Sequence, residues 1–567
     1  MLRALAAILA LAPLAAAAQE PAKFHSVSDQ RLVSPEPGNW LMVRGNYQGW
    51  MYSPLEQINV GNVAELTPVW SIPTGVTASH QAPPLVNDGI MLVATPFNQV
   101  MAVDAKTGTV LWRHKRALPD GFWPLHNTSR GVALYGESVY FASLDAVLEA
   151  LDARTGKVLW QAVVEDYLTG PYMTMAPLIV NGLVMVGVSG GEFGVRGFIQ
   201  AFDADSGESV WKTYTIPGPG EPGHDTWTGD TWQHGGGTVW LTGTYDPETG
   251  LTFWGTDNGS PWAGDQRPGD NLYTASTIAI DPKDGRIVDY FQHQWNESWD
   301  WGEVDAPMVV DFTSGGQNVK GLIKAARNGY LYWLSRERTG IAFIKAVPYV
   351  SQNVFTSLDP ITGRPSYDPA RVPGTGKKAE FCPSQWGGKN WPYAAFNPLT
   401  RMIYIPSNDN HCGSLEFHKQ ERVAGKLYTG TDPSDIGFTA DDEADYYGQI
   451  QAWSVDRGER VWDHKFETSL WAPLMSTAGG LIFAGGTDDR YFRAFDAATG
   501  ELLWKYRTSS GILAPASSYM IDGVQYVAVV SGKDLEPSYT RRLLSEWLGW
   551  PAGEPSGGKI WAFALTR

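Results

Sequence analysis

A ten-residue motif recurs along the chain and constrains its fold more than any other feature. The segment VDAKTGTVLW at 103–112 returns as LDARTGKVLW at 151–160, FDADSGESVW at 202–211, YDPETGLTFW at 245–254 and FDAATGELLW at 495–504. Each copy joins two β-rich runs through an Asp-x-x-x-Gly turn, in which Asp accepts hydrogen bonds from nearby amides and Gly supplies a positive φ. The motif therefore predicts repeated β-hairpins.

The spacing of these hairpins indicates how they are arranged. Weaker copies begin at Ile280, Leu334, Phe396 and Val455, so the motif returns every roughly 35 to 60 residues, a period typical of propellers. The chain has 62 glycines and 25 tryptophans and almost no amphipathic helical pattern. These features favour four-stranded blades arranged radially about a channel, with a β-sandwich array as the alternative.

The two ends of the repeat region are each predicted to form a strand without a local partner. These strands are LTPVWSIPTG at 66–75 and the closing GKIWAFALTR. We expect them to complete one blade together, because such closure removes open sheet edges. Insertions at 261–273, 411–449 and 534–557 break the rhythm and are expected to form the binding face.

The first residues and the composition predict where the protein acts. Residues 1–18, MLRALAAILALAPLAAAA, have the pattern of a cleaved secretory signal, so we expect a periplasmic protein whose residues 19–567 form one domain. No later stretch approaches the roughly 20 apolar residues of a membrane span, which predicts no membrane insertion. A net charge of -17 argues against a nucleic-acid partner.

The chain contains two cysteines, Cys382 and Cys412. In an oxidising compartment an even pair is more often a structural disulfide than a redox or metal site. The sequence has no C-x-x-C-H segment, which predicts that no c-type haem is attached and that electrons leave to a separate carrier.

Two short motifs resemble sites that their context does not support. Residues 187–191 match the G-x-S-x-G nucleophile elbow, but a strand and not a helix is predicted to follow them. Residues 218–223 match G-x-G-x-x-G, yet two prolines occupy the loop and no helix follows. The sequence therefore favours neither a hydrolase nor a dinucleotide-binding protein.

Four polar motifs interrupt the strand-like sequence and carry the candidate chemistry. They are SGGEFGVRG at 189–197, GTDNGSPW at 255–262, ESWDWGEVD at 297–305 and KAARNGYLYWL at 324–334. Glu192, Asn258 and Asp300 offer the carboxylate and amide oxygens that Ca²⁺ prefers. Arg327 offers a planar fork of donors for carbonyl oxygens.

In this order, the four motifs resemble those of the methanol and ethanol dehydrogenases that use pyrroloquinoline quinone (PQQ). The resemblance implies an all-β fold, an eight-bladed β-propeller of four-stranded antiparallel blades. It implies that Glu192, Asn258 and Asp300 bind a metal, that Asp300 is also the catalytic base, and that Arg327 contacts the quinone oxygens. An alcohol would be oxidised by hydride transfer to the quinone, with electrons passed to an external acceptor, usually a c-type cytochrome.

The same resemblance implies a binding site for PQQ. Trp240, in GGGTVW, matches the tryptophan on which the quinone stacks. Other positions that match PQQ contacts are Gln81, Arg130, Thr174, Ser189, Gly190, Gly191, Asn390 and Trp471. A flat quinone with three carboxylates needs an aromatic platform, cationic and hydroxyl donors, and a metal that polarises the reacting carbonyl.

The chain departs from the family in its quinone pocket. Many relatives have two adjacent cysteines beneath the quinone, and those positions correspond here to Pro124 and Leu125, which predicts a pocket open to alcohols larger than methanol. Gln81 stands where relatives often have Glu. Cys382 and Cys412 match the longer-range structural bridge of the family.

The metal is predicted from one further position. Relatives that use lanthanides carry an extra acid two residues after the catalytic Asp, and here that position is Gly302, which predicts Ca²⁺ in preference to a lanthanide. Glu303 and Asp305 lie close by and keep the lanthanide alternative open. A non-catalytic propeller scaffold and an inactive quinoprotein homologue are the rival functions.

Overall fold

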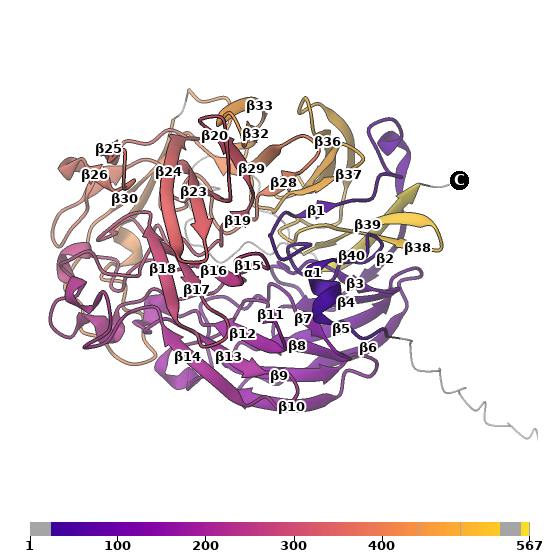
Figure 1. The fold of residues 1–567 in the computed structure, drawn as a ribbon, viewed down its shortest axis with the longest axis horizontal. Coiled ribbons are helices and arrows are strands. Elements are labelled where there is room, and N and C mark those ends of the chain that lie inside the picture. The colour runs from indigo at the N-terminus through magenta and orange to yellow at the C-terminus, as the bar shows by residue number, and fades with distance from the viewer. Residues whose placement is uncertain (1–23, 442, 488, 533–556, 566–567) are drawn as a thin grey trace, which may run out of the picture.

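Eight antiparallel sheets succeed one another around a ring in the computed structural model, which describes residues 24–441, 443–487, 489–532 and 557–565 (Figure 1). The first blade contains β3 (Leu85–Asn87), β4 (Ile90–Thr95), β5 (Gln99–Asp104) and β6 (Val110–Lys115), and the second contains β7 (Ala133–Tyr135), β8 (Ser138–Ala142), β9 (Val147–Asp152) and β10 (Val158–Val163). The third blade contains β11 (Leu178–Val180), β12 (Leu183–Gly187), β13 (Phe198–Asp203) and β14 (Ser209–Tyr214), and the fourth contains β15 (Thr244–Asp246), β16 (Leu251–Gly255), β17 (Ser276–Ile280) and β18 (Ile287–Gln292).

The chain then forms three more blades before it returns to its beginning. The fifth blade contains β19 (Met308–Val309), β22 (Gly321–Ala325), β23 (Tyr330–Glu337) and β24 (Gly340–Pro348). The sixth contains β28 (Ala395–Asn397), β29 (Met402–Asn408), β32 (Gly448–Ser454) and β33 (Glu459–Phe466). The seventh contains β34 (Met475–Thr477), β35 (Leu481–Ala484), β36 (Tyr491–Asp496) and β37 (Leu502–Arg507). β1 (Tyr52–Ser53) adds a parallel fifth strand beside β34. The prediction of an eight-bladed propeller with four-stranded antiparallel blades is confirmed.

The eighth blade joins the two ends of the described chain. It contains β38 (Ser517–Ile521), β39 (Val524–Ser531), β40 (Lys559–Leu565) and, as its outer strand, β2 (Leu66–Pro73). β2 pairs antiparallel with β40, and in Figure 1 it lies beside the yellow strands at the end of the chain. The predicted closure is confirmed, and it joins an early strand to the last strand of the described chain in one blade.

The recurring motif explains how neighbouring blades are held together. In the first copy Asp104 Oδ1 accepts the amide hydrogens of Lys106 at 3.0 Å and Thr107 at 2.8 Å, which closes the turn between β5 and β6. Trp112 at the end of the copy donates from Nε1 to the carbonyl of Ala153 in the next blade at 3.0 Å. A Cβ on Gly156 would lie 2.4 Å from the Trp112 ring, so this turn requires glycine for packing as well as for its positive φ.

The same contact repeats around the ring. Trp160 donates to Ala204, Trp211 to Pro282 and Trp462 to Ala497. Trp504 donates to the carbonyl of Leu66 at 2.9 Å and so continues the pattern across the closure. The Trp of each such copy thus packs on the turn of the following blade.

One strong copy of the motif occupies a different hairpin. The turn at 246–250 joins β15 to β16, the first two strands of its blade, whereas the strongest other copies join the third strand to the fourth. In this blade the weak copy from Ile280 forms the outer hairpin, and its Gly285 packs against Trp211. An Asp-x-x-x-Gly turn suits any tight hairpin, so the motif alone does not identify which one it forms.

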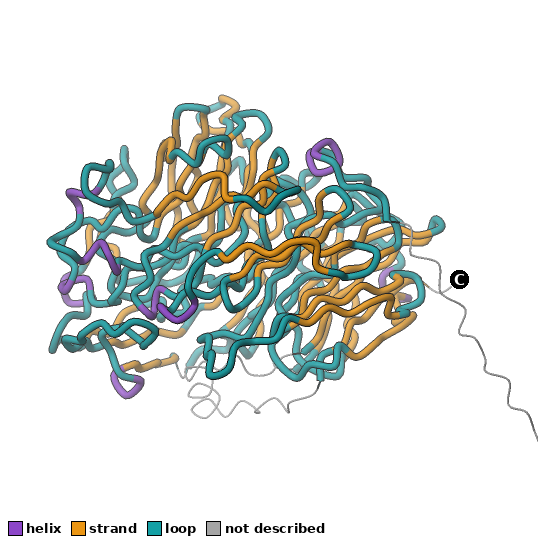
Figure 2. The backbone as a smooth tube through the Cα atoms, turned by 90° about the horizontal axis from the view of Figure 1, so that it is seen from below, coloured by secondary structure: helices purple, strands orange, loops and turns teal. Residues whose placement is uncertain are grey.

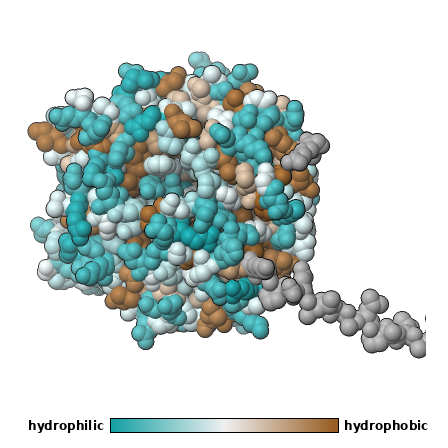
Figure 3. All heavy atoms as spheres, turned by 45° about the vertical axis from the view of Figure 1, so that its right-hand side comes forward, coloured by the Kyte–Doolittle hydropathy of each residue, from teal (hydrophilic) through white to brown (hydrophobic). Residues whose placement is uncertain are grey.

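Among the described residues, helical structure is confined to short segments outside the blades (Figure 2). They are α1 (Asp29–Val33) and the 3₁₀ turns η1 (Val63–Glu65), η2 (Tyr167–Thr169), η3 (Gly191–Phe193), η4 (His224–Thr226), η5 (Thr231–His234), η6 (Gly264–Gln266), η7 (Pro369–Arg371) and η8 (Pro433–Asp435). Within the described ranges no helix is long and apolar enough to cross a membrane. On the face drawn in Figure 3, hydrophobic residues form small patches among hydrophilic ones.

The remaining strands form small sheets in the connections between blades. They are β20 (Phe312–Ser314) with β21 (Gln317–Val319), β25 (Phe355–Leu358) with β26 (Pro365–Tyr367), and β27 (Ala379–Phe381) with β30 (His411–Leu415) and β31 (Ile436–Ala440). The expected secretory segment 1–18 lies outside the described residues, as does the 534–557 insertion apart from residue 557. That residues 19–567 form one domain stays a prediction.

Candidate active site

The antiparallel blades bring distant segments to one end of the ring. The start of the first strand of a blade and the end of its second strand lie side by side, because these two strands run in opposite directions. Thr174 precedes β11, Trp240 precedes β15, Asn258 follows β16 and Arg327 follows β22. All four line one cavity of about 330 Å³.

The cavity collects most of the residues predicted from the sequence. It is lined by Arg130, Thr174, Ser189, Glu192, Trp240, Asn258, Asp300, Arg327, Asn390 and Trp471. Gln81 is buried but does not belong to the lining, and neither do Gly190 and Gly191, which shape the adjacent turn. A Cβ on Gly190 would lie 2.6 Å from the carbonyl oxygen of Gly170, so that turn requires glycine.

Two of the predicted insertions also form walls of this cavity. Trp262 comes from the first insertion, and Leu427, Thr429, Thr431, Pro433 and Ile436 come from the second. The backbone amide of Tyr428 donates to the carbonyl of Glu192 at 2.6 Å and ties the second insertion to the site. The two insertions thus border the candidate cavity, and that they form the binding face stays a prediction.

A carboxylate that the sequence reasoning did not identify joins the predicted ones. Asp257 lines the cavity with Glu192 and Asp300. Burial, followed by the charge of Asp257, raises the pKa of Glu192 to about 7. Burial also raises the pKa of Asp300 well above its usual value, and the charges of Glu192 and Asp257 add to this effect against the opposing charge of Arg327. The three acids therefore form one group of like charges.

Contacts of both its side chain and its backbone amide hold Arg327 beside Asp300. Its Nη2 lies 3.6 Å from Asp300 Oδ2 and also donates to the carbonyl of Gln385. Its backbone amide donates to Glu303 Oε1 at 3.0 Å. The guanidinium is thus held next to the predicted base, where its charge favours the ionised carboxylate.

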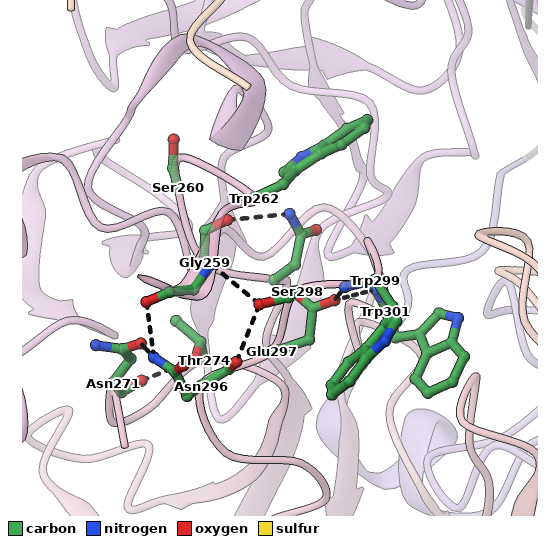
Figure 4. A network of polar contacts seen from close by, with 12 residues as sticks. Gly259, Ser260, Trp262, Asn271, Thr274, Asn296, Glu297, Ser298, Trp299 and Trp301 are labelled. Carbon is green, nitrogen blue, oxygen red and sulfur yellow. Dashed lines mark hydrogen bonds between the residues drawn. The ribbon is translucent and has the colours of Figure 1, made fainter. Parts of the chain in front are cut away.

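The loop that carries Asp300 is shaped by a buried acid. Glu297 Oε1 accepts the amide hydrogens of Trp299 at 2.5 Å and Trp301 at 2.8 Å (Figure 4). Asp300 between them has a φ of 62°, in the left-handed region that non-glycine residues seldom adopt. Arg267, which is fully buried, lies 3.8 Å from Glu297 and balances its charge. This network presents Asp300 to the cavity.

Another part of the cavity lining combines aromatic rings with a cation. The Arg130 guanidinium lies 4.7 Å from the Trp240 ring centroid and 5.2 Å from that of Trp391. Its Nη1 donates to Thr174 Oγ1 at 2.5 Å, and that oxygen lies 3.3 Å from Ser189 Oγ. The arrangement provides a flat surface next to cationic and hydroxyl donors.

Two expectations about cysteine concern the surroundings of the cavity. Cys382 and Cys412 form a disulfide, which confirms the structural bridge. Leu125, at one of the two positions that correspond to the adjacent cysteines of many relatives, lines the cavity. An aliphatic side chain therefore forms part of this wall.

The lining fits the expected quinone and metal. Among the described residues, Arg327 Nε, Trp262 Nε1 and Trp391 Nε1 are buried donors without a hydrogen-bond partner. Buried polar groups in this state indicate a ligand or ion that satisfies them. Tryptophan faces and unsatisfied donors suit a flat polyanionic quinone, and the oxygens of Glu192, Asn258 and Asp300 suit a hard cation.

Comparison with known proteins agrees with this geometry. The family model described as "Glucose/ethanol/alcohol dehydrogenase, beta-propeller domain" matches residues 40–357 and 467–527. The quinoprotein alcohol dehydrogenase PedH of Pseudomonas putida is 39% identical, with 95% of this chain and 93% of that protein covered. The lanthanide-dependent methanol dehydrogenase of Methylacidiphilum fumariolicum is 34% identical, with 94% and 93% covered.

A solved structure extends the likeness to the whole fold. A europium-containing methanol dehydrogenase superimposes with a TM-score of 0.88 at 32% identity, with 94% of this chain and 100% of that chain covered. Cavity, family model and relatives agree, and the chain belongs to the PQQ-dependent alcohol dehydrogenase family.

Proposed function

We propose that Asp300 is the base with which this alcohol dehydrogenase removes the hydroxyl proton of its substrate. The single observation that carries the proposal is the convergence of Asp300, Glu192, Asn258 and Arg327 on one tryptophan-lined cavity. Arg327, 3.6 Å from Asp300, favours the charged carboxylate that a base requires.

The residues of the chain divide into groups that would hold the two cofactors. Glu192, Asn258 and Asp300 would bind the metal, which is Ca²⁺ or a lanthanide. Trp240 would support the quinone ring, with Arg130, Thr174, Ser189, Asn390 and Trp471 around it. When bound at these residues, PQQ would supply the acceptor for the hydride of the alcohol carbon, and the metal would supply a Lewis acid for the reacting oxygen.

The side chains of the site would then orient the alcohol and receive its proton. Asp300 would accept the proton at a carboxylate oxygen, and Arg327 would stabilise negative charge that develops nearby. Trp262, Leu427 and Leu125 line the cavity, and their apolar surfaces would limit the access of water to it. The wall at Leu125 supports acceptance of primary, secondary or polyol substrates larger than methanol.

The surroundings in which the enzyme works are also a proposal. The Cys382–Cys412 disulfide is typical of an oxidising compartment such as the periplasm, and the secretory pattern at 1–18 supports export. The absence of a C-x-x-C-H segment favours a separate acceptor, for which we propose a c-type cytochrome.

Reconstitution tests the proposal against its rivals. The purified protein is loaded with PQQ and with Ca²⁺ or a lanthanide, and dye reduction is followed with primary, secondary and polyol alcohols. We expect quinone absorbance on the protein and turnover that is lost in Asp300→Asn. Quinone binding without turnover on any alcohol would indicate an inactive homologue, and no quinone binding would indicate a scaffold.

A further inference from the structure

Asp257 lines the same cavity as the predicted metal ligands and has a carboxylate oxygen without a hydrogen-bond partner in the described part of the chain. The residue is 3% exposed and immediately precedes Asn258. Its Oδ2 accepts hydrogen bonds from Trp240 Nε1 at 2.7 Å and from Thr238 Oγ1 at 3.2 Å. Its Oδ1 is buried and has no hydrogen-bond partner among the described residues. A buried carboxylate oxygen in this state requires a cation or donor that the protein does not itself supply.

The position of Oδ1 is fixed by its relation to the Asp300 loop. A Cβ built on Gly302 would lie 1.7 Å from Asp257 Oδ1 and 2.8 Å from its Cγ. The Asp257 carboxylate therefore fills the space that a side chain two residues after Asp300 would occupy. Gly191, next to Glu192, lies on the other side, because a Cβ there would be 3.9 Å from Asp257 Oδ2. Asp257 thus lies between the turns that carry Asp300 and Glu192.

We infer that Asp257, through Oδ1, is a further ligand of the metal held by Glu192, Asn258 and Asp300, and that it makes the site prefer a trivalent cation to Ca²⁺. The inference rests on the proposed metal site. Coulomb attraction scales with the charge of the ion, so each added carboxylate gains half as much again with a trivalent as with a divalent cation. The number of charged ligands also sets the affinity of such oxygen sites.

The position of Asp257 removes the reason for expecting Ca²⁺. That expectation followed from Gly302, which brings no acid into the site. In the structure the acid enters the same space from residue 257, on a different turn. The chain thus combines Gly302 with Asp257, whose Oδ1 lies in the space that a Cβ at residue 302 would occupy.

Asp257 also links the metal site to the quinone platform. The Oδ2 bond to Trp240 Nε1 fixes the indole on which the quinone is expected to stack. One carboxylate can therefore bind the cation through one oxygen and orient the platform through the other. An asparagine at 257 retains an oxygen that can accept the Trp240 bond but removes the charge, so Asp257→Asn separates the two roles.

The test measures cation binding to the mature full-length protein loaded with PQQ. Tb³⁺ and Ca²⁺ are titrated into the metal-free protein, with binding followed by calorimetry and by Tb³⁺ emission excited through neighbouring tryptophans. We expect Asp257→Asn to lower the ratio of Tb³⁺ affinity to Ca²⁺ affinity by at least about tenfold. Equal weakening of both ions, or an unchanged ratio, would overturn the inference.

Two controls separate charge from packing. Thr238→Val removes one bond to Oδ2 but keeps the carboxylate, and Asp265→Asn removes an exposed charge from a neighbouring loop. Both should keep the wild-type affinity ratio, and a fall in Thr238→Val equal to that in Asp257→Asn would show a packing effect and overturn the inference.

A further comparison separates this inference from the proposed function. If wild type binds neither ion, the proposed metal site fails and the inference with it. If binding depends on Glu192 and Asp300 but not on Asp257, the metal site stands and only the inference fails. Thermal unfolding of each metal-free variant verifies that the protein remains folded.

Discussion

Two groups of buried or half-buried carboxylates lie close together in this protein, and they differ in what balances their charge. Glu303 pairs with Lys324 at 3.2 Å, and Asp305 pairs with Lys389 at 2.6 Å. Glu192, Asp257 and Asp300 face the cavity instead, where Arg327 approaches Asp300 at 3.6 Å. In the first group each carboxylate has its own lysine, whereas the second places three carboxyl groups near one guanidinium.

The difference shows which acids are structural and which are reserved for a ligand. A buried charge is stable only with a partner, and the lysines supply that partner for Glu303 and Asp305. Glu303 also accepts the backbone amide of Arg327 and thereby supports the site from outside it. The cavity group is instead suited to a cation that the protein must acquire.

The largest effect is expected from Asp300→Ala. Loss of the proposed base and of one metal ligand should lower turnover by at least about a thousandfold. Dye-linked turnover at saturating PQQ and metal measures it, with cation affinity as a second readout. Turnover close to that of wild type would assign the base to another residue.

Breaking the lysine-paired group should affect stability whether or not a metal is present. Glu303→Gln leaves Lys324 buried without its partner, and the free energy of unfolding should fall by about 3–5 kcal/mol. Denaturant unfolding with and without the cation measures this. A cost that disappears when the cation is added would place Glu303 in the metal-binding group and contradict the comparison.

Removal of the metal should lower the stability of the protein if the cavity carboxylates Glu192, Asp257 and Asp300 bind the ion. At a cation concentration about 100 times the Kd, binding to the folded state should stabilise wild type by about 2.7 kcal/mol. The cation should raise the free energy of unfolding of Glu303→Gln by a similar amount, although this variant is less stable without the ion. At the same cation concentration it should raise that of Asp300→Ala only slightly. Similar increments in all three proteins would show that the ion binds elsewhere.

The smallest effect is expected from Gly302→Ala. The new methyl would collide with Asp257 Oδ1 and should lower stability by about 1–3 kcal/mol. In an Asp257→Gly background the same change should cost less, because that oxygen is gone. Thermal unfolding of the four proteins in this double-mutant cycle measures the coupling, and additive effects would contradict the shared space.

The blades could be predicted from sequence because their signals are local. The Asp104 turn and Trp112 lie within one hairpin, and the same spacing recurs in the other copies. Which hairpin of a blade a copy forms could not be predicted from the local sequence. Trp254 matches the motif, but it packs inside its own blade and donates to Thr252.

The site was predictable only where a residue matched a known motif. Asn258 and Asp300 matched known ligand positions, whereas Asp257 did not. The only sign of Asp257 in the sequence is that an acid directly precedes Asn258. The proposed role of Asp257 follows from its position beside Gly302, which lies on another turn and is brought near only by the fold. Gln81, predicted by correspondence alone, is buried outside the cavity lining.

Anomalous diffraction from crystals of the protein with PQQ and a lanthanide tests the central claim most directly. The account predicts one ion at about 2.3–2.6 Å from oxygens of Glu192, Asn258, Asp300 and Asp257 Oδ1. An ion at the more exposed group His418, Asp432 and Asp435, with none in the cavity, would contradict it.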